Sequence, residues 1–388
     1  MTTGRLVRQD ITDRSDLPSG PQGLRWLVDR AWPLWLEHGV DWRHRAFHEH
    51  LDSTSLQCRA PFRRLRVAAR QTYVFSKAAR YGVPRAKEAV ALGLDFLRGP
   101  ARLPNGGFAW RFDLDNRPID STRDLYDHAF VLLGFAAAAE VVGTDRVRAD
   151  AIALLDYITT QFVHPAGGYR DSIPATAPRR QNPHMHLFEA LLAASDAFRD
   201  ELFFSRARDL AALFVARFFQ VKEGALPEYF DEALAPCREA GRFLVQAGHH
   251  YEWIWLLHRY EKSAAAMGAS AGPDLTSAAG SLFEFAERYA VSAANGLVAN
   301  SNWSDGAVAD GGFRLWPQTE RLKAVARRRP DCAAPALGAI ARHLAGARPG
   351  LWIERMDDGG RAIVEAAPAT SLYHLTAAFT DDAVLTVS

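Results

Sequence analysis

Glycine turns recur along this chain at a spacing of about sixty residues, and this repeat limits the folds that the sequence can adopt. A glycine followed closely by an aromatic or large apolar residue stands at Gly106, Gly167, Gly224, Gly296 and Gly350, with gaps of 61, 57, 72 and 54 residues. Before each turn lies an apolar segment of helical periodicity, and after it come a short extended polar stretch and a new helix. The repeat therefore predicts units of two helices and a short β-hairpin.

Units of this kind cannot bury their apolar faces alone, so the copies must stack against one another. The 388 residues hold about six of them. Six helical hairpins that close into a ring form an all-α (α/α)6 barrel with short β-hairpins at the loop face. We expect one catalytic domain over residues 1–388, in which residues 1–24 are a polar N-terminal extension. The alternative is an open α-solenoid, although end caps with a polar outer face are not obvious.

One expected helix is apolar around most of its circumference. Its sequence, LYDHAFVLLGFAAAAE, follows Ser121-Thr122-Arg123-Asp124, which has the character of a capping box and places the helix start near Ser121. Such a helix belongs inside the protein, against two layers. Its apolar run, residues 129–139, is too short to span a bilayer.

The charge and cysteine content limit the kinds of molecule that the protein is expected to bind and the compartment in which it is expected to act. The chain has 46 basic and 45 acidic side chains and no long basic cluster, which argues against binding to nucleic acid or to an anionic membrane. The cysteines are few and widely spaced, which disfavours a disulfide framework, and the polar N-terminus lacks the apolar core of a signal peptide. We therefore expect a cytoplasmic protein that binds a small, nearly neutral molecule, while the oligomeric state stays open.

Histidine and glutamate occur three residues apart in two apolar segments, as His186 with Glu189 and His249 with Glu252. Residues at this spacing share one face of a helix. A third histidine, His374, opens another apolar segment. Because imidazole is both a base and an acid near neutral pH, three histidines on three helices indicate a proton-transfer site. For any single histidine, the alternative is a core side chain bonded to a main-chain carbonyl.

Neighbouring residues diverge by about 100° around a helix, so one of His249 and His250 should point inward and the other outward. The pairing with Glu252 selects His249, and we expect Glu252 to orient the His249 ring. The other histidine helix is expected to start near His184, after residues 182–183 have ended the preceding loop.

Other chemistries lack their local signatures. Neither His184-Met185-His186 nor His249-His250 has the HExxH spacing or a clear set of carboxylates and thiolates, so we expect no metal. The sequence has no P-loop, dinucleotide fingerprint or GxSxG motif, so we expect no cofactor. A glycoside hydrolase needs two carboxylates across the scissile bond and would leave the histidines without a role. Its candidate carboxylates are Asp127, Glu189, Glu228 and Glu252.

Six ordered segments resemble the N-acylglucosamine 2-epimerase superfamily, and most of all its D-mannose isomerase branch. They are RVAARQTYVFS, DSTRDLYDHAFVLLG, RQNPHMHLFEALLA, GHHYEWIWLL, RLWPQTERLKA and SLYHL, and the match as a whole runs from about residue 26 to residue 374. The resemblance implies an (α/α)6 barrel and a metal-independent interconversion of aldoses with ketoses or with their C2 epimers. The expected reaction is the interconversion of D-mannose and D-fructose through a cis-enediolate. The alternatives are a sugar 2-epimerase of the mannose/glucose or cellobiose type, or a barrel that only binds a protein partner.

The resemblance also implies roles for individual residues. His249 and His374 match the family's acid/base pair, and His186 matches a third histidine that helps to open the ring or to hold the sugar. Arg70 is expected to stabilise the enediolate oxygen, and the loop over residues 295–312 is expected to shape the pocket rim. The remaining matches to the substrate pocket are Tyr126, Asn182, Glu252, Trp316 and, more weakly, Glu189.

Overall fold

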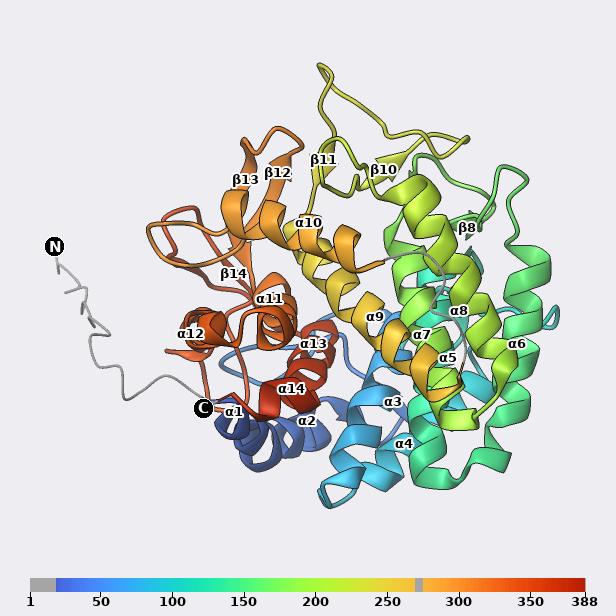
Figure 1. The fold of residues 1–388 in the computed structure, drawn as a ribbon. Helices are drawn as coiled ribbons and strands as arrows, with labels where there is room; N and C mark the ends of the chain where they lie inside the picture. Colours follow the sequence, from blue (N-terminus) through green and yellow to red (C-terminus); the bar gives the residue numbers. More distant parts are fainter. Residues whose placement is uncertain (1–18, 269–274, 388) are drawn as a thin grey trace, which may run out of the picture.

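A computed structural model describes residues 19–268 and 275–387, and its centre is a ring of helices (Figure 1). Each helix of the ring contacts the next, and the last, α13, contacts the first, α3. This closure shows that the open solenoid is wrong and that the (α/α)6 barrel is confirmed. The inner helices are α3 (Leu65–Arg80), α5 (Leu125–Val142), α7 (Asn182–Phe198), α9 (Ala247–Ala266), α11 (Leu315–Arg328) and α13 (Ala369–Phe379).

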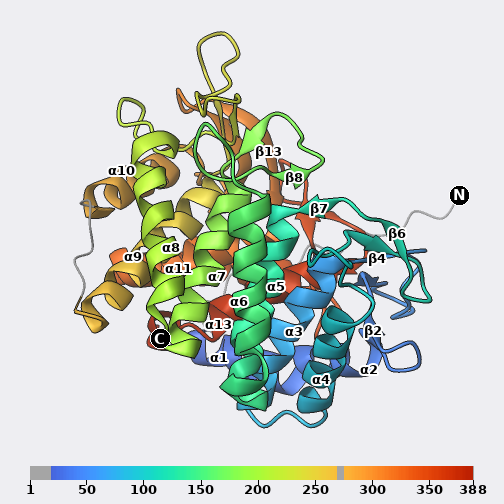
Figure 2. The same ribbon diagram turned by 90° about the vertical axis from the view of Figure 1, so that its right-hand side faces the viewer.

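A second layer of helices surrounds this ring, as Figure 2 shows for α6 and α8 outside α5 and α7. Its first member is broken into α1 (Gly20–Trp26), the π-helix η2 (Leu27–Ala31) and α2 (Trp32–His38). Residues 20–24, which we had placed in the N-terminal extension, are thus the start of α1, and residues 1–18 lie outside the described residues. The other outer helices are α4 (Ala86–Arg98), α6 (Arg148–Gln161), α8 (Glu201–Leu213) with η4 (Phe214–Phe218), α10 (Leu275–Tyr289) and α12 (Ala333–Leu344); the short helices are η3 (Thr144–Arg146), η5 (Pro330–Cys332) and α14 (Asp382–Leu385).

Short antiparallel strands gather at the N-terminal ends of the inner helices, which confirms the predicted hairpins. A strand ends at most two residues before each inner helix begins. The largest sheet joins β11 (Leu244–Val245), β12 (Ala299–Trp303), β13 (Val308–Arg314), β14 (Arg355–Met356) and β15 (Ala362–Ile363). The smaller sheets pair β4 (Arg63–Arg64), β5 (Arg111–Phe112) and β6 (Pro118–Asp120); β1 (Val40–Asp41) and β2 (Ala46–Phe47); β3 (His50–Leu51) and β16 (Ala367–Pro368); β7 (Arg123–Asp124) and β8 (Ser172–Ile173); and β9 (Arg179–Arg180) and β10 (Tyr229–Phe230).

Helix α5 is the apolar helix that the sequence predicted to lie inside. By length and composition it could cross a membrane, but 78% of its apolar window is buried within the barrel, as expected of a core helix. Its start was predicted wrongly, because the chain is still extended in β7 at Asp124 and the helix begins at Leu125. The cap is Asp124, whose carboxylate accepts the amide N–H of Asp127 at 3.1 Å.

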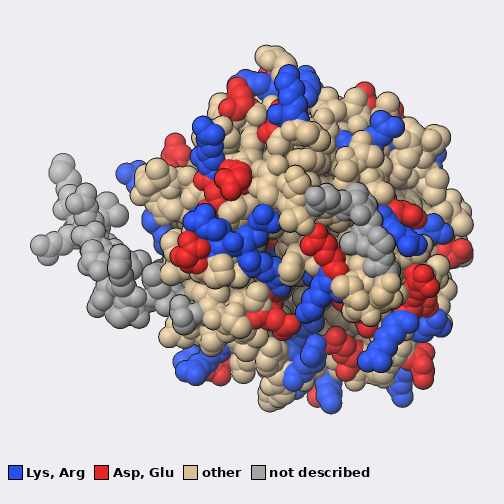
Figure 3. Space-filling view, viewed as in Figure 1, with Lys and Arg blue, Asp and Glu red and all other residues tan. Residues whose placement is uncertain are grey.

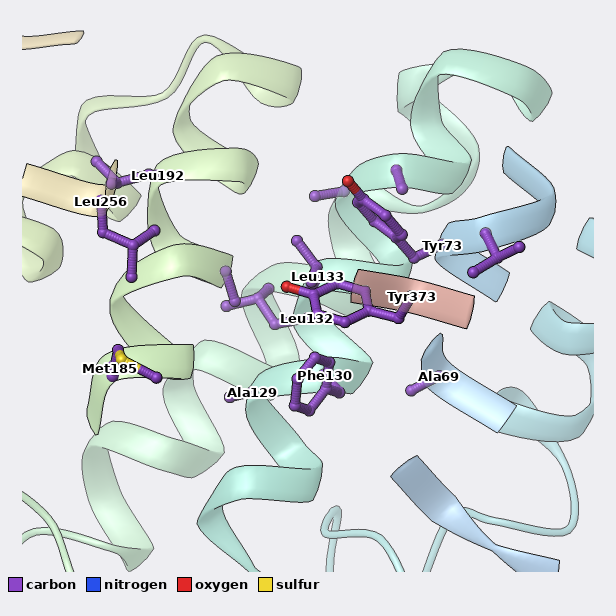
Figure 4. Packing of buried hydrophobic residues seen from close by; sticks show 14 of the residues in the cluster. Ala69, Tyr73, Ala129, Phe130, Leu132, Leu133, Met185, Leu192, Leu256 and Tyr373 are labelled. Carbon is purple, nitrogen blue, oxygen red and sulfur yellow. The ribbon is translucent and has the colours of Figure 1, made fainter. Parts of the chain in front are cut away.

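Aromatic rings from different inner helices fill the barrel core (Figure 4). Phe130 of α5 meets Tyr373 of α13 edge to face with ring centroids 5.3 Å apart, and Tyr373 meets Tyr73 of α3 at 5.2 Å. Met185 and Leu256 bring α7 and α9 into the same core. Truncation of Phe130 to alanine would cost about 3–5 kcal/mol by the usual scale for buried phenylalanine.

Neither basic nor acidic side chains dominate the face of the molecule shown in Figure 3, where the two kinds are interspersed. This distribution agrees with the formal net charge of +1. A neutral surface of mixed charge gives no long-range attraction for polyanions.

The glycine turns have the backbone geometry that the repeat predicted. The φ angles are positive at Gly106 (91°), Gly167 (99°), Gly224 (62°), Gly296 (74°) and Gly350 (92°). L-residues with a Cβ rarely adopt such angles, so glycine is needed at these positions.

Buried side chains tie several of these turns to the inner helices, and we call them turn clamps. In α5, Nε2 of His128 accepts the amide N–H of Phe108 at 3.1 Å, while its Nδ1 donates to the carbonyl of Asp124 at 2.7 Å. The clamp fixes the start of the helix relative to the turn. The equivalent contacts are made by His184 to the amide of Tyr169 (3.0 Å), by His250 to the amide of Leu226 (3.0 Å) and by Gln318 to the amide of Val298 (2.9 Å).

Candidate active site

A cavity of about 280 Å³ lies at the N-terminal ends of the inner helices. It brings together residues that are far apart in the chain, including all three histidines that we predicted to be catalytic. Its lining residues are Arg70, Tyr126, Arg180, Asn182, His186, Glu228, Tyr229, Gln246, His249, Glu252, Arg314, Trp316, Thr370, Ser371 and His374. Of the predicted site residues, Glu189 alone does not line this cavity and lies behind His186.

The neighbouring histidines divide into two groups. His186 and His249 line the cavity, whereas His184 and His250 are turn clamps with both ring nitrogens bonded to the main chain. The alternative of a core histidine bonded to the main chain therefore holds for His184 and His250. Helix α7 starts at Asn182, two residues earlier than predicted, because proline is tolerated in the first turn of a helix.

His249 is held by a glutamate from another part of the chain. Its Nδ1 lies 2.8 Å from Oε1 of Glu228, and its Nε2 lies 3.1 Å from Nδ2 of Asn182. Because the carboxylate of Glu228 can only accept and the amide nitrogen of Asn182 can only donate, Nδ1 carries the proton and Nε2 carries the lone pair. Our prediction that Glu252 orients this ring is wrong. Gln181 packs against the pair, with its Nε2 3.1 Å from Nδ1 of His249 and 3.3 Å from Oε1 of Glu228, and its Oε1 accepts from Nε1 of Trp253 at 2.8 Å.

His374 has a corresponding partner on α11. Its Nδ1 lies 2.9 Å from Oε1 of Glu320, and the other oxygen of Glu320 forms an ion pair with Nζ of Lys323 at 2.6 Å. Burial, together with the nearby charges of Arg70 and Lys323, lowers the pKa of His374 well below its usual value. The ring is therefore neutral at pH 7, and its Nε2 has no hydrogen-bond partner among the described residues.

His186 is the one cavity histidine whose partner was predicted. Its Nδ1 lies 3.2 Å from Oε2 of Glu189. The other oxygen of Glu189, Oε1, accepts a hydrogen bond from the hydroxyl of Tyr373. Burial lowers the pKa of His186 to about 4. Burial alone would raise the pKa of Glu189, but the contact with His186 and the charge of Lys323 lower it to about 2. The pair is thus a neutral imidazole that donates to a carboxylate.

Glu252 stands apart from these three pairs. Its Oε1 lies 3.8 Å from Nδ1 of His186, and neither of its oxygens has a hydrogen-bond partner within the described chain. Burial and the neighbouring carboxylate of Glu320 raise the pKa of Glu252 well above its usual value. This shift favours the protonated form of the carboxyl group, which can donate a hydrogen bond into the cavity.

Arg70 supplies positive charge without a carboxylate partner among residues 19–268 and 275–387. The side chain is 4% exposed and lies over the ring of Phe130 at 4.1 Å and the ring of Tyr373 at 4.9 Å. It donates to the hydroxyl of Tyr126 at 2.5 Å and to the carbonyl of Thr370 at 3.3 Å. A guanidinium held in this way is available to a negative oxygen in the cavity.

Trp316 packs against both of the histidines that we expected to be the acid/base pair, with ring centroids 4.9 Å from His249 and 5.7 Å from His374. Gly248 lies in the first turn of α9 and makes room for this ring. A Cβ at Gly248 would lie 2.4 Å from the Trp316 ring. The position of Trp316 therefore depends on the missing side chain at residue 248.

A wider cavity of about 940 Å³, which we call the vestibule, adjoins the inner cavity. The two share Gln246, Arg314, Trp316 and Thr370. The hairpin of β12 and β13 contributes Asn300, Ser301 and Asp310 to the vestibule wall, as expected for the loop over residues 295–312.

Two groups of side chains in the cavity have the composition of a metal site: His186 with Glu189 and Glu252, and Glu252 with Glu320 and His374. In both groups the histidine nitrogen within reach is the Nδ1 that faces a glutamate. Lys323 already provides a cation 2.6 Å from Glu320. In each group the histidine and one glutamate are thus paired with each other, and Glu252 is the member without a hydrogen bond from a described residue.

Sequence reasoning missed Glu228, Glu320 and Arg180 as parts of the site. Glu228 appeared only as a candidate carboxylate of the hydrolase alternative, which explains the histidines less well than the pairs found here. Glu320 lies within the segment RLWPQTERLKA that carries the family resemblance, and this was its only signal.

The comparisons with known proteins agree with this geometry. Residues 46–378 match the family model of the N-acylglucosamine 2-epimerase (GlcNAc 2-epimerase), and the chain belongs to this family. It is therefore an enzyme of the sugar isomerase and epimerase class.

Individual relatives are named for both reactions. The chain is 35% identical to a mannose-6-phosphate isomerase of Rhizobium meliloti (strain 1021), over 91% of this chain and 94% of that protein. It is 34% identical to a D-mannose isomerase of Thermobifida fusca over 50% of this chain and 52% of the relative. Among solved structures, a D-mannose isomerase superposes with a TM-score of 0.81 at 22% identity, covering 94% of this chain and 97% of the other. A cellobiose 2-epimerase from Spirochaeta thermophila DSM 6192 gives 0.81 at 21% identity, covering 94% and 95%.

Proposed function

We propose that this enzyme interconverts D-mannose and D-fructose by proton transfer between C1 and C2 through a cis-enediolate. The observation that carries the proposal is the pair of imidazoles, His249 and His374, each with Nδ1 on a glutamate and both packed on Trp316. Each pair leaves Nε2 as the nitrogen that faces the sugar. Relatives named D-mannose isomerase and mannose-6-phosphate isomerase support an aldose–ketose reaction.

The sugar must first open, because only the open-chain aldehyde has an acidic C2 proton. Ring opening transfers a proton from the O1 hydroxyl to the ring oxygen. The neutral ring of His186 and the protonated carboxyl of Glu252 lie 3.8 Å apart in the cavity wall and suit these two roles. We assign His186 to O1 and Glu252 to the ring oxygen.

One acid/base histidine then takes the C2 proton, and the electron pair forms the C1–C2 double bond while O1 becomes negative. Arg70 stabilises this oxygen, and because the charge is absent in the aldehyde, the contact favours the transition state. Return of the proton to C1, with transfer of the O2 proton to the negative O1, gives the ketose. The carboxylate of Glu228 stabilises the imidazolium that His249 becomes when it holds the proton.

The second candidate is a 2-epimerase, which returns a proton to C2 from the opposite face. The placement of His249 and His374 on two different helices supports a 2-epimerase as the second candidate, since two bases can reach the two faces of one carbon. The structural similarity to a cellobiose 2-epimerase shows the fold alone.

Metal independence belongs to this proposal as well. The Nδ1 atoms of the candidate ligands are engaged by glutamates, and acid/base chemistry by imidazole needs no Lewis acid. We also propose that the enzyme acts in the cytoplasm, where its three free cysteines would stay reduced.

The test is incubation of the purified, EDTA-treated enzyme with D-mannose in D2O, followed by NMR of the products. Fructose with deuterium at C1 is the expected result, although internal return of the proton reduces the label. Glucose labelled at C2 would move the assignment to the 2-epimerase, and activity that returns only with an added divalent metal would refute metal independence. The matched control is His249→Gln, which keeps a polar side chain in the cavity but removes the base.

A further inference from the structure

The junction between the inner cavity and the vestibule has one charged side chain, and it is a cation. Of the residues shared by the two cavities, Gln246, Trp316 and Thr370 are uncharged, and Arg314 is the exception. The orientation of the sugar given next rests on the proposed function. Because C1 and C2 must reach the histidines of the inner cavity, the far end of the hexose, at C6, lies toward this junction.

Arg314 is poorly neutralised where it stands. It is the last residue of β13 and the N-cap position of α11, and its side chain is 49% exposed. Its acidic partner is Glu354, with a single contact of 3.5 Å between Nη2 and Oε1. Glu354 is already engaged by the hydroxyl of Ser371 at 2.7 Å and by Nε1 of Trp352 at 3.2 Å. Most donors of the Arg314 guanidinium are therefore free for a ligand.

The other charges of the vestibule leave a second cation unpaired. Arg64 is bonded to Glu49 at 2.6 Å and Arg355 to Glu365 at 2.8 Å, so these pairs are nearly neutral. Arg59 also lines the vestibule, and no acidic side chain of the described ranges pairs with it. The one remaining acid, Asp310, accepts from Asn300 at 3.1 Å and from the amide of Gly312 at 2.9 Å.

We propose that Arg314 is a specificity-determining residue that binds an anionic group on C6 of the hexose, and that the class of group is a phosphate ester. Guanidinium donors match phosphate oxygens in a bidentate arrangement. The vestibule, at about 940 Å³, has room for the ester beyond the inner cavity. Arg59 supplies the second positive charge that a phosphate dianion requires.

The experiment compares initial rates of the full-length enzyme with D-mannose and with D-mannose 6-phosphate. We expect kcat/KM to be at least tenfold higher for the ester, through KM, and the preference to shrink between 20 mM and 500 mM salt, because charge pairs at an exposed mouth are screened. In Arg314→Gln, the ratio of the two kcat/KM values falls about tenfold, whereas Arg314→Lys keeps part of it. The matched control is Arg117→Gln, which removes a paired and exposed arginine on the turn between β5 and β6.

The outcomes separate this inference from the proposed function. Turnover of D-mannose with no preference for the ester, or a ratio unchanged in Arg314→Gln, overturns the inference and leaves the isomerase standing. If neither sugar is turned over, the proposed function fails. Calorimetric titration with D-mannose 6-phosphate then decides whether the anion site exists. Binding that weakens tenfold in Arg314→Gln supports the anion site, and the absence of binding by the wild-type enzyme overturns it.

Discussion

Nδ1 of His249 lies 2.8 Å from Oε1 of Glu228, a residue 21 positions earlier in the chain. The glutamate on the same helix, Glu252, is left without a hydrogen bond from any described residue. Glu228 therefore sets the tautomer of His249, and Glu252 is left available for the role in ring opening that we propose for it.

The first prediction separates these two glutamates. Glu228→Gln removes the charge that stabilises the protonated form of His249, so kcat should fall about 10- to 100-fold and the acid limb of the pH–rate profile should move. Glu252→Gln is the matched control, because the amide has the shape of a protonated carboxyl group and can still donate a hydrogen bond, while the contact of Glu228 with His249 is kept. In this control the acid limb should stay in place. Equal profiles for the two variants would contradict the assignment of Glu228.

The second prediction concerns the acid/base pair itself. His249→Ala and His374→Ala should each reduce kcat about 10²- to 10⁴-fold, the usual contribution of a general acid or base. Circular dichroism and thermal melts should show folded protein, because both side chains border a cavity. A variant with a near-normal rate would remove that histidine from the mechanism.

The third prediction concerns the turn clamps and acid stability. Burial lowers the pKa of His250 to about 3, whereas an unfolded chain takes up this proton near pH 6.5. The folded state thus binds fewer protons below pH 6.5, and its stability is lost as the pH falls through the range from 6.5 to 3. At pH 5 this one residue lowers the free energy of unfolding by about 2 kcal/mol relative to pH 7.

His250→Gln tests this effect, because Gln318 shows that glutamine makes the same clamp on α11. Urea titrations at pH 7 and pH 5 should show that the acid-induced loss is about 2 kcal/mol smaller in the variant. His128→Gln, at the equivalent clamp on α5, should behave in the same way. An unchanged loss in both variants would mean that these rings are protonated in the folded protein.

The fourth prediction uses the close approach of Gly248 to Trp316. Gly248→Ala places a Cβ 2.4 Å from the Trp316 ring, which must shift away from its position against His249. Since misplacement by about 1 Å can cost 10²-fold in rate, we expect kcat/KM to fall tenfold or more. The control is Gly280→Ala on α10, where the Cβ meets a flexible arginine atom at 3.4 Å. It should keep full activity and gain up to about 1 kcal/mol of stability.

The barrel could be predicted from the sequence because each of its units is local. The glycine turns and the apolar character of helices such as α5 are contained within one stretch of chain. The pairing of His186 with Glu189 was predictable for the same reason, since both lie on one helix at a spacing of three.

The partners of the other two histidines could not be predicted in this way. Glu228 lies before β10 and Glu320 lies on α11, 54 positions from His374, so only the folded arrangement brings each carboxylate to its ring. For His249, the rule for residues three apart named Glu252, but the hydrogen bond of its Nδ1 goes to the loop residue Glu228. Local geometry allows a pair, and the competition among all nearby acceptors decides whether it forms.

The turn clamps act only on main-chain amides and carbonyls, so they do not depend on which side chains the hairpins carry. Mutations in the hairpins can therefore alter the mouth of the cavity while the starts of the inner helices stay fixed. In a scaffold of this kind, the residues that select the substrate can change while the residues that transfer the proton stay in place. A library of variants confined to β12 and β13 should therefore yield enzymes that catalyse the same proton transfer between C1 and C2 but accept different sugars.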